Sequence, residues 1–303
     1  MTIPASISMP GRPPAKPLVN VYIDGYNFYV PLSAGEPRYY DLCWCDFEKL
    51  AQTLVKRLSV SHPREFGGCG VGAVKYFTAT IPGNMPQQPE GIDRKYQWLD
   101  AVHYHSGGRV EIVHGTFRPR THRFYIERDE LAGLARSGIA LNWDLIPNTA
   151  TTFRPKLRMH EEKQTDVMLA TALVTDAALQ RVGGKPQPAV QAPPQHRENC
   201  RPTPSACHAA IVISADIDFL PAAEVSASVF NCPVAMAFTF PHAGYRLSDL
   251  SPGRTNGIFT VDVSDEELRS CRLPDVISLP GEKKIDFRRY RSSHFAKTGG
   301  GGA

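Results

Sequence analysis

The sequence lacks any apolar run of the roughly 20 residues that a membrane-spanning helix needs. Its opening residues, MTIPASISMPGRPPAKP, contain neither a charged n-region nor an apolar core, so no secretory signal is expected. The seven cysteines form no even, regular framework, which argues against a disulfide-stapled secreted scaffold. We therefore expect a cytoplasmic protein with reduced thiols and no membrane contact.

The chain also has little net charge, +4 at pH 7 over 303 residues, so whole-protein charge identifies no polyanionic partner. Its hydrophobic fraction of 42% and charged fraction of 21% are ordinary for a soluble globular protein. Four segments depart from this average. We interpret them as a disordered Pro-rich lead (1–17), an Arg-rich insertion (118–158), a flexible Pro-rich insertion (183–208) and a basic, flexible tail (273–303).

One group of metal-ligating residue types lies in the Pro-rich insertion. His196, Cys200, Cys207 and His208 are close together in the sequence, but their spacing matches no common zinc knuckle. Whether they bind zinc stays open.

Apolar patterns predict strands that alternate with helices, which favours a parallel sheet with right-handed crossovers. The expected fold is α/β, a three-layer, doubly wound, mostly parallel sheet. The expected strands are 19–23, 71–79, 109–117, 210–214, 233–240 and 257–263, and the expected helices are 46–58, 92–105, 161–180, one beginning near 218, and 264–270.

Carboxylates stand where two of these strands end. Asp24 follows the apolar run of the first strand, and Asp216 and Asp218 follow the run that ends at Ser214. Ligands of open α/β sheets gather at the carboxyl ends of the strands, so these acids are candidates for chemistry. The alternative is local: Asp24 and the nearby Asn27 could serve only the turn, and Asp218 could cap the next helix.

A third acid lies at the start of the helix over 161–180. Asp166, Ala170, Leu173 and Ala177 follow a 4-3-4 spacing, which places Asp166 on the buried face, with Thr165 as the N-cap. A buried carboxylate needs compensation from the helix N-terminus, a cation or a metal.

Together, the acids predict an all-oxygen site without His or Cys ligands, which suits Mg²⁺ or Mn²⁺. Such ions polarise phosphates and activate water, so phosphodiester hydrolysis is the reaction that this chemistry serves best. An alternative takes Asp216-Ile217-Asp218 as a phosphatase-type motif with Asp216 as the nucleophile. That alternative leaves Asp24 and Asp166 unexplained.

Five motifs in order, VYIDGYN, KYFTATI, VHGTF, EEKQTDVMLATALVTDA and VISADIDFLPA, resemble the NYN domain of the PIN-like nuclease superfamily. The likeness is closest to its LabA-like bacterial branch, and we assign the domain to 18–272. The resemblance implies a PIN-like, Rossmannoid fold and a metal-dependent ribonuclease. It matches Asp24, Asp166, Asp216 and Asp218 to metal-site acids, Asn27 to a polar residue that orients the site, and Lys163 to a phosphate contact.

Basic residues supply candidates for holding RNA. Arg118, Arg120 and Arg123 lie in the Arg-rich insertion beside a strand end, and Arg288 and Arg289 lie in the basic tail. The leading hypothesis is a Mg²⁺- or Mn²⁺-dependent ribonuclease, with RNA as its partner. The alternative is a catalytically silent module of the same fold that binds RNA or protein. The tail could also recruit a protein partner or a second copy of the chain.

Overall fold

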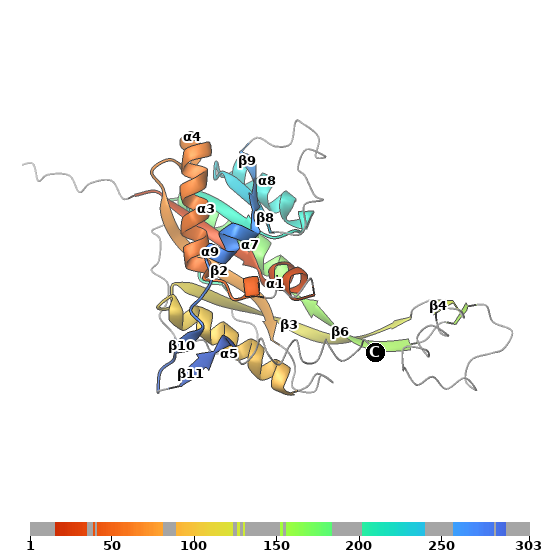
Figure 1. Cartoon of the computed structure of the whole chain (residues 1–303). Coiled ribbons are helices and arrows are strands. Elements are labelled where there is room, and N and C mark those ends of the chain that lie inside the picture. Colours follow the sequence, from red (N-terminus) through yellow and green to blue (C-terminus); the bar gives the residue numbers. More distant parts are fainter. Residues whose placement is uncertain are drawn as a thin grey trace, which may run out of the picture.

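A seven-stranded sheet forms the centre of the protein in its computed structural model (Figure 1). The structure describes residues 16–34, 39, 41–80, 89–123, 126–127, 130, 152–153, 156–183, 202–239, 257–281 and 283–288. The sheet has the order β6-β3-β2-β1-β7-β8-β9. Six neighbouring strands are parallel, and β6 pairs antiparallel with β3 at one edge. The predicted doubly wound, mostly parallel α/β sheet is therefore confirmed.

The helices and strands follow each other along the chain as an alternating α/β series. The strands of the main sheet are β1 (Leu18–Asp24), β2 (Gly70–Thr80), β3 (Val110–Arg123), β6 (Lys156–Lys163), β7 (Ala209–Ile213), β8 (Val234–Thr239) and β9 (Ile258–Val263). The helices are α1 (Gly25–Ala34), η1 (Asp41–Cys43), α3 (Phe47–Ser61), α4 (Pro63–Phe66), α5 (Pro89–His105), α7 (Thr165–Arg181), η3 (Ile217–Phe219), α8 (Leu220–Ser228) and α9 (Asp265–Ser270). Two small ribbons are formed by β4 (Ile126–Glu127) with β5 (Thr152–Phe153), and by β10 (Val276–Ser278) with β11 (Lys284–Asp286).

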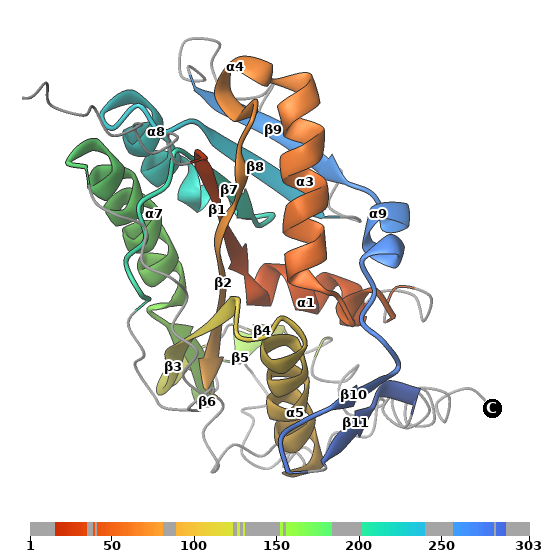
Figure 2. The same ribbon diagram turned by 90° about the vertical axis from the view of Figure 1, so that its left-hand side faces the viewer.

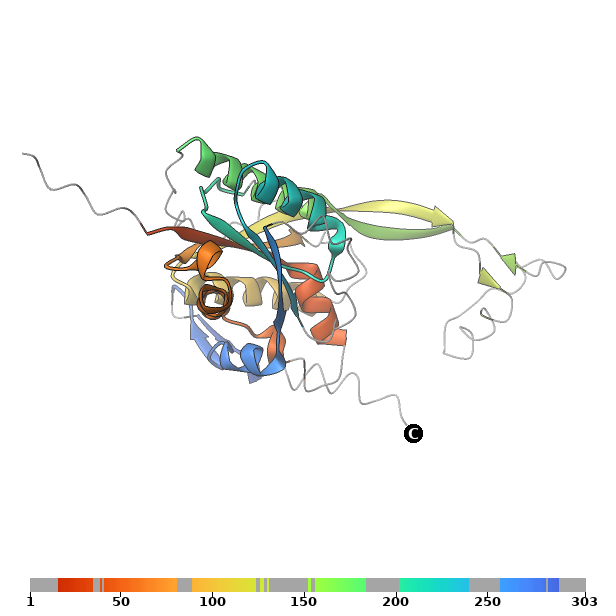
Figure 3. The same ribbon diagram turned by 90° about the horizontal axis from the view of Figure 1, so that it is seen from above.

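Helices cover both faces of the sheet and give three layers. Figure 3 shows α7 and α8 on one side of the sheet and α3, α5 and α9 on the other. Because side chains alternate along a strand, β1 contributes to two cores. Val21 and Ile23 pack with Leu50 of α3, and Tyr22 packs with Leu173 of α7. No helix in the described part of the chain is long and apolar enough to cross a membrane.

Local sequence signals placed several helix ends correctly. The helix expected from residue 46 begins at Phe47, because the Asp46 side chain accepts a hydrogen bond from the Lys49 N–H and caps α3. Ser264 and Glu267 form a capping box at α9. Pro221 lies in the first turn of α8, where its missing N–H carries no cost.

Two predicted flexible segments are partly packed. The predicted tail contains β10 and β11, whose Ile277 and Ile285 are buried in the core, and Phe287 stacks on Trp44 at 4.7 Å between ring centroids. This ribbon lies beside α5 (Figure 2). The end of the predicted Pro-rich insertion is packed as well, since Ser205 and Cys207 are buried. Residues 184–201 of the insertion, residues 282 and 289–303 of the tail, and residues 1–15 of the lead lie outside the described residues.

The Arg-rich insertion begins and ends as a two-stranded ribbon rather than as a loop. Strand β3 was expected to end at Phe117, but it continues to Arg123 and pairs with β6, with Arg123 opposite Lys156. Figure 1 shows this ribbon leaving the body of the protein. We call residues 118–123 and the paired residues 156–161 the basic ribbon, because they contain Arg118, Arg120, Arg123, Lys156 and Arg158 against one acid, Glu161, which lies opposite Arg118.

Four buried groups, one tyrosine hydroxyl and three cysteine thiols, should make the free energy of unfolding fall at alkaline pH. Burial raises the pKa of Tyr22, Cys43 and Cys45 in the folded protein. For Cys207, a hydrogen bond with Cys232 comes first and burial second, and both raise its pKa. These groups keep their protons in the folded state at a pH where the unfolded chain, with pKa values of about 8.5 for Cys and 10 for Tyr, loses them.

We therefore expect these groups to add no pH dependence to the free energy of unfolding below about pH 8.5 and to lower that free energy above it. Each group contributes a slope of about 1.4 kcal/mol per pH unit until its folded pKa is reached. Urea unfolding at a series of pH values measures this slope. The Cys45→Ala variant should have a shallower slope, and an unchanged free energy from neutral pH to about pH 10 would contradict the assignment.

Candidate functional site at the β1–β7 switch point

The order of the strands reverses direction at β1. From β1 the chain builds outward through β2 and β3, and then returns to the other side of β1 with β7, β8 and β9. Such a switch point opens a crevice outside the carboxyl ends of the two central strands, where ligands of doubly wound sheets bind. Here β1 ends at Asp24, and the last residue pair between the two strands is Ile23 with Ile213. The predicted acids Asp24 and Asp216 thus follow two adjacent strands.

Asp24 is 1% exposed and accepts four hydrogen bonds. Its Oδ1 accepts from the backbone N–H groups of Tyr26 and Asn27, each at 3.1 Å. Its Oδ2 accepts from Asn27 Nδ2 at 2.6 Å and from Ser214 Oγ at 2.9 Å. This carboxylate therefore has the local role that the sequence allowed, since it caps the start of α1, and it also lies at the switch point of the sheet.

Ser214 joins the two strand ends. Its hydroxyl donates to Asp24 and accepts from the backbone N–H of Asp216 at 3.0 Å. Ser214 was not predicted as a site residue, although its position directly after the apolar run AAIVI and two residues before Asp216 is a usable signal. Ser214 fixes the orientation of the Asp24 carboxylate and the start of the turn that carries Asp216.

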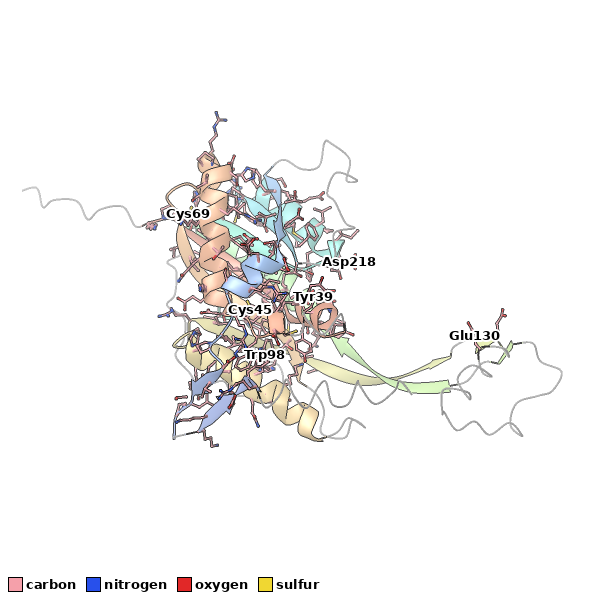
Figure 4. All side chains as sticks on the ribbon, in the orientation of Figure 1. Tyr39, Cys45, Cys69, Trp98, Glu130 and Asp218 are labelled. Atoms are coloured by element: carbon pink, nitrogen blue, oxygen red, sulfur yellow. The ribbon has the colours of Figure 1, made fainter. Side chains whose placement is uncertain are left out.

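The other strand-end acids face solvent. Asp216 is half-buried, and its Oδ1 accepts from the Asp218 N–H at 2.8 Å, so Asp216 is the N-cap of η3. Asp218 is exposed and lies inside η3, so the alternative that Asp218 caps the helix is wrong. Figure 4 shows Asp218 on the side of the body from which the basic ribbon also projects.

Gly25 allows β1 and α1 to meet at this tight junction. A Cβ at this position would lie 2.5 Å from the Phe77 carbonyl oxygen and 2.5 Å from Cζ of Tyr76. Tyr76 in turn donates a hydrogen bond from its hydroxyl to the Gly25 carbonyl oxygen at 3.2 Å. The chain can therefore turn directly from Asp24 into α1, which brings the Asn27 side chain back onto the carboxylate.

Asp166 does not occupy the place that its spacing predicted. The buried face of α7 consists of Thr165, Leu169, Ala172, Leu173, Asp176 and Ala177. Asp166 is exposed in the first turn of the helix, so its expected burial is wrong. Thr165 is the first helical residue rather than the N-cap, because Gln164 precedes it in a left-handed conformation with φ of 81°. Lys163 ends β6 and does not begin the helix.

The acid that α7 buries is Asp176, and it is neutralised within the protein. Lys75 Nζ lies 2.5 Å from Asp176 Oδ2, and both side chains are at most 1% exposed. Tyr22 OH donates to the same oxygen at 2.7 Å, and the Ser205 N–H donates to Oδ1 at 2.7 Å. This ion pair was not predicted, since Lys75 has the sequence pattern of an ordinary polar residue in a strand.

Asp24 differs from Asp176 because no lysine or arginine of the described chain pairs with it. Its four donors are neutral amides and a hydroxyl.

Among the predicted RNA contacts, Arg288 forms a bidentate ion pair with Asp286, so its guanidinium has a partner within the protein. The side chains of Arg118, Arg120, Arg123 and Lys163, and the whole of Arg289, lie outside what the structure describes.

The four predicted metal-site acids, Asp24, Asp166, Asp216 and Asp218, do not form one compact cluster in the described structure. Within the described residues, no three His, Cys, Asp or Glu side chains come close enough together to hold a metal ion. Cys207 is buried and its Sγ lies 3.8 Å from that of Cys232, whereas His208 is exposed. The two other residues of the open zinc interpretation, His196 and Cys200, lie outside the described residues.

Comparison with known proteins adds little to this picture. No protein-family model matches the chain, and no curated protein matches it. A crystal structure of a protein of unknown function from Vibrio parahaemolyticus is similar at 12% sequence identity and a TM-score of 0.35. That similarity covers 84% of this chain and 98% of the Vibrio chain.

Proposed function

We propose that this protein is a Mg²⁺- or Mn²⁺-dependent ribonuclease of the NYN type whose ion is held by Asp24 and Asp216. One observation carries the proposal: a carboxylate that is 1% exposed lies at the switch point of the sheet without a lysine or arginine partner in the described chain. Burying a carboxylate is costly unless a cation or strong hydrogen bonds compensate it. The other buried acid, Asp176, has Lys75 for this purpose.

The donor set at the switch point fits a hard ion. Its charged ligands are carboxylates alone, and Mg²⁺ and Mn²⁺ prefer oxygen. Proteins usually bind Mg²⁺ through one or two carboxylates, with water and substrate phosphate as the remaining ligands. Two acids are therefore sufficient, and a third carboxylate in contact is not required. The exposed Asp218, two residues after Asp216, would add negative charge at the rim of the site.

The residues around Asp24 would orient it for this role. Asn27 and Ser214 donate to the same oxygen, so they fix the direction in which the carboxylate points. Ser214 also holds the backbone of Asp216, which couples the positions of the two acids. When bound, the ion would polarise the phosphodiester and activate water for in-line displacement. The basic ribbon would hold the phosphates of the RNA on either side of the site.

The test is to incubate the purified chain with mixed RNA and DNA substrates, with Mn²⁺ and with a chelator, and to sequence the products. We expect RNA fragments that appear only with the ion. Intact RNA under both conditions would contradict the nuclease.

One observation favours a second function, a catalytically silent RNA-binding regulator of cytoplasmic RNA. The four hydrogen bonds to Asp24 fill about all the acceptor positions of a carboxylate, so an ion must displace one donor. A structural Asp24 would leave RNA bound and intact at millimolar Mn²⁺. Retention of full-length RNA on the protein under those conditions distinguishes this function from the nuclease.

A further inference from the structure

Exposed aromatic rings are rare in the described part of the chain, and both of them lie on α1, which begins directly after Asp24. Among the exposed large apolar side chains of the described residues, only Tyr26 and Tyr29 are aromatic, at 56% and 37% exposed. The backbone N–H of Tyr26 donates directly to Asp24 Oδ1. A solvent-exposed ring thus lies two residues from the buried carboxylate of the candidate site.

The packing of α1 determines that these rings point outward. Phe28 and Leu32, on the inner face of the helix, are almost fully buried, and Phe28 packs edge-on against Phe47 at 5.0 Å between ring centroids. Tyr26 and Tyr29 are three residues apart, so they share one face of the helix. Tyr29 is supported from behind by Trp98, with ring centroids 5.9 Å apart. Tyr26 is the more exposed of the two rings.

The acids on the neighbouring strand have an exposed apolar neighbour too. Ile217, between Asp216 and Asp218, is 42% exposed. The candidate site is therefore bordered by exposed apolar side chains on both the α1 side and the η3 side. A phosphate group alone does not pack against apolar side chains. A nucleotide with an unpaired base has a flat apolar face beside its phosphate, and that face can stack on an aromatic ring.

We propose that Tyr26 stacks on an unpaired base next to the phosphate held at Asp24 and Asp216, so that the substrate is single-stranded RNA. This inference rests on the proposed function, because it assumes that a phosphate of RNA occupies the switch point. Charge complementarity favours RNA over an apolar protein partner. The basic ribbon continues β3 beyond the carboxyl ends of the parallel strands, the end of the sheet at which Asp24 lies. The bases of a duplex are stacked and paired with each other and would not reach the ring.

The test measures binding of the full chain to three labelled probes with Ca²⁺ in place of Mn²⁺, so that the site can hold an ion, and a gel of the recovered probes checks that the RNA stays intact. The probes are an oligouridine, a strand of the same length made of abasic ribose phosphates, and an RNA duplex. Stacking of one base predicts that the chain binds the oligouridine about tenfold more tightly than the abasic strand. Tyr26→Ala should remove that preference, and Tyr26→Phe, which retains the ring, should keep it.

Tyr104→Ala is the matched control. Tyr104 lies in the last turn of α5, just before β3 begins. It is therefore near the amino ends of the parallel strands, whereas Asp24 lies at their carboxyl ends, so the loss of Tyr104 should leave the preference unchanged. Thermal unfolding checks that each variant is folded. The proposal is overturned if Tyr26→Ala weakens all probes equally or none, if the duplex binds as tightly as the single strand, or if no RNA binds.

Failure of this inference and failure of the nuclease are separable. The chain could bind RNA in a way that depends on the Tyr26 ring and yet never cut it, even with Mn²⁺. That result would support the stacking site and contradict the proposed nuclease activity. The wild type could instead cleave RNA in a metal-dependent way with no preference for unpaired bases, and Tyr26→Ala could cleave it equally well. That result would contradict only the stacking proposal.

Discussion

Replacing Asp176 by alanine should lower the free energy of unfolding by about 3–5 kcal/mol, among the largest single effects expected in this protein. The substitution leaves the Lys75 ammonium, 1% exposed, without its partner at 2.5 Å. It also removes the acceptor for Tyr22 OH and for the Ser205 N–H. Urea unfolding of the variant at neutral pH measures the loss.

Two controls separate the buried charge from ordinary loss of contacts. The double variant Lys75→Met/Asp176→Leu replaces both charges by apolar groups of similar size. It should recover the part of the lost stability that comes from the unpaired ammonium, while the loss of the acceptor for Tyr22 OH and the Ser205 N–H remains. Asp265→Ala breaks the half-exposed ion pair with Arg269, where the N–O distance is 3.7 Å, and should cost no more than about 1 kcal/mol. If Asp176→Ala destabilises the protein no more than Asp265→Ala, the buried pair is not what holds α7 against the sheet.

Replacing Asp24 by asparagine is expected to reduce Mn²⁺-dependent cleavage of RNA by about 100-fold or more. The change removes the charge that would hold the ion and places an N–H₂ group where Asn27 and Ser214 now donate. Loss of a residue that orients a metal ligand costs 10- to 100-fold, roughly, so loss of a ligand should reach at least the upper limit. Ser214→Ala, which only removes a group that orients Asp24, should lie near tenfold.

These rates have meaning only if the variants fold. In Asp24→Asn, the oxygen of the new amide can still accept from the N–H groups of Tyr26 and Asn27. We therefore expect a loss of unfolding free energy of about 1–2 kcal/mol rather than unfolding. Asp265→Asn, in the first turn of α9, is the matched control and should cleave like the wild type. Cleavage by Asp24→Asn at the wild-type rate would show that this carboxylate serves only to cap α1.

The sequence predicted the parts of the fold that depend on neighbours along the chain. The end of β1 at Asp24, the cap at Asp46 and the strand over Ala209–Ile213 all follow from local patterns. The adjacency of Asp24 and Asp216 was also predictable, because parallel strands bring their carboxyl ends to one edge of the sheet.

The parts that were missed depend on contacts between distant residues. Leu173 and Ala177 belong both to the buried face that the sequence predicted, which contains Asp166, and to the observed one, which contains Asp176. The alanine-rich sequence of α7 fits either face, so it does not show which acid is buried. The true choice, Asp176 rather than Asp166, is decided by Lys75, about 100 residues earlier in the chain, since only that partner makes burial tolerable. The hydrogen bond between Ser214 and Asp24 spans 190 residues and has no local signal that names its partner.

The most direct test of the proposed ion site is to measure Mn²⁺ binding by the full chain, using the electron paramagnetic resonance signal of the free ion. We predict that the wild type binds Mn²⁺ and that Asp24→Asn/Asp216→Asn does not, while Asp265→Asn binds it like the wild type. Equal Mn²⁺ binding by the wild type and by the double variant would contradict an ion held between the ends of β1 and β7.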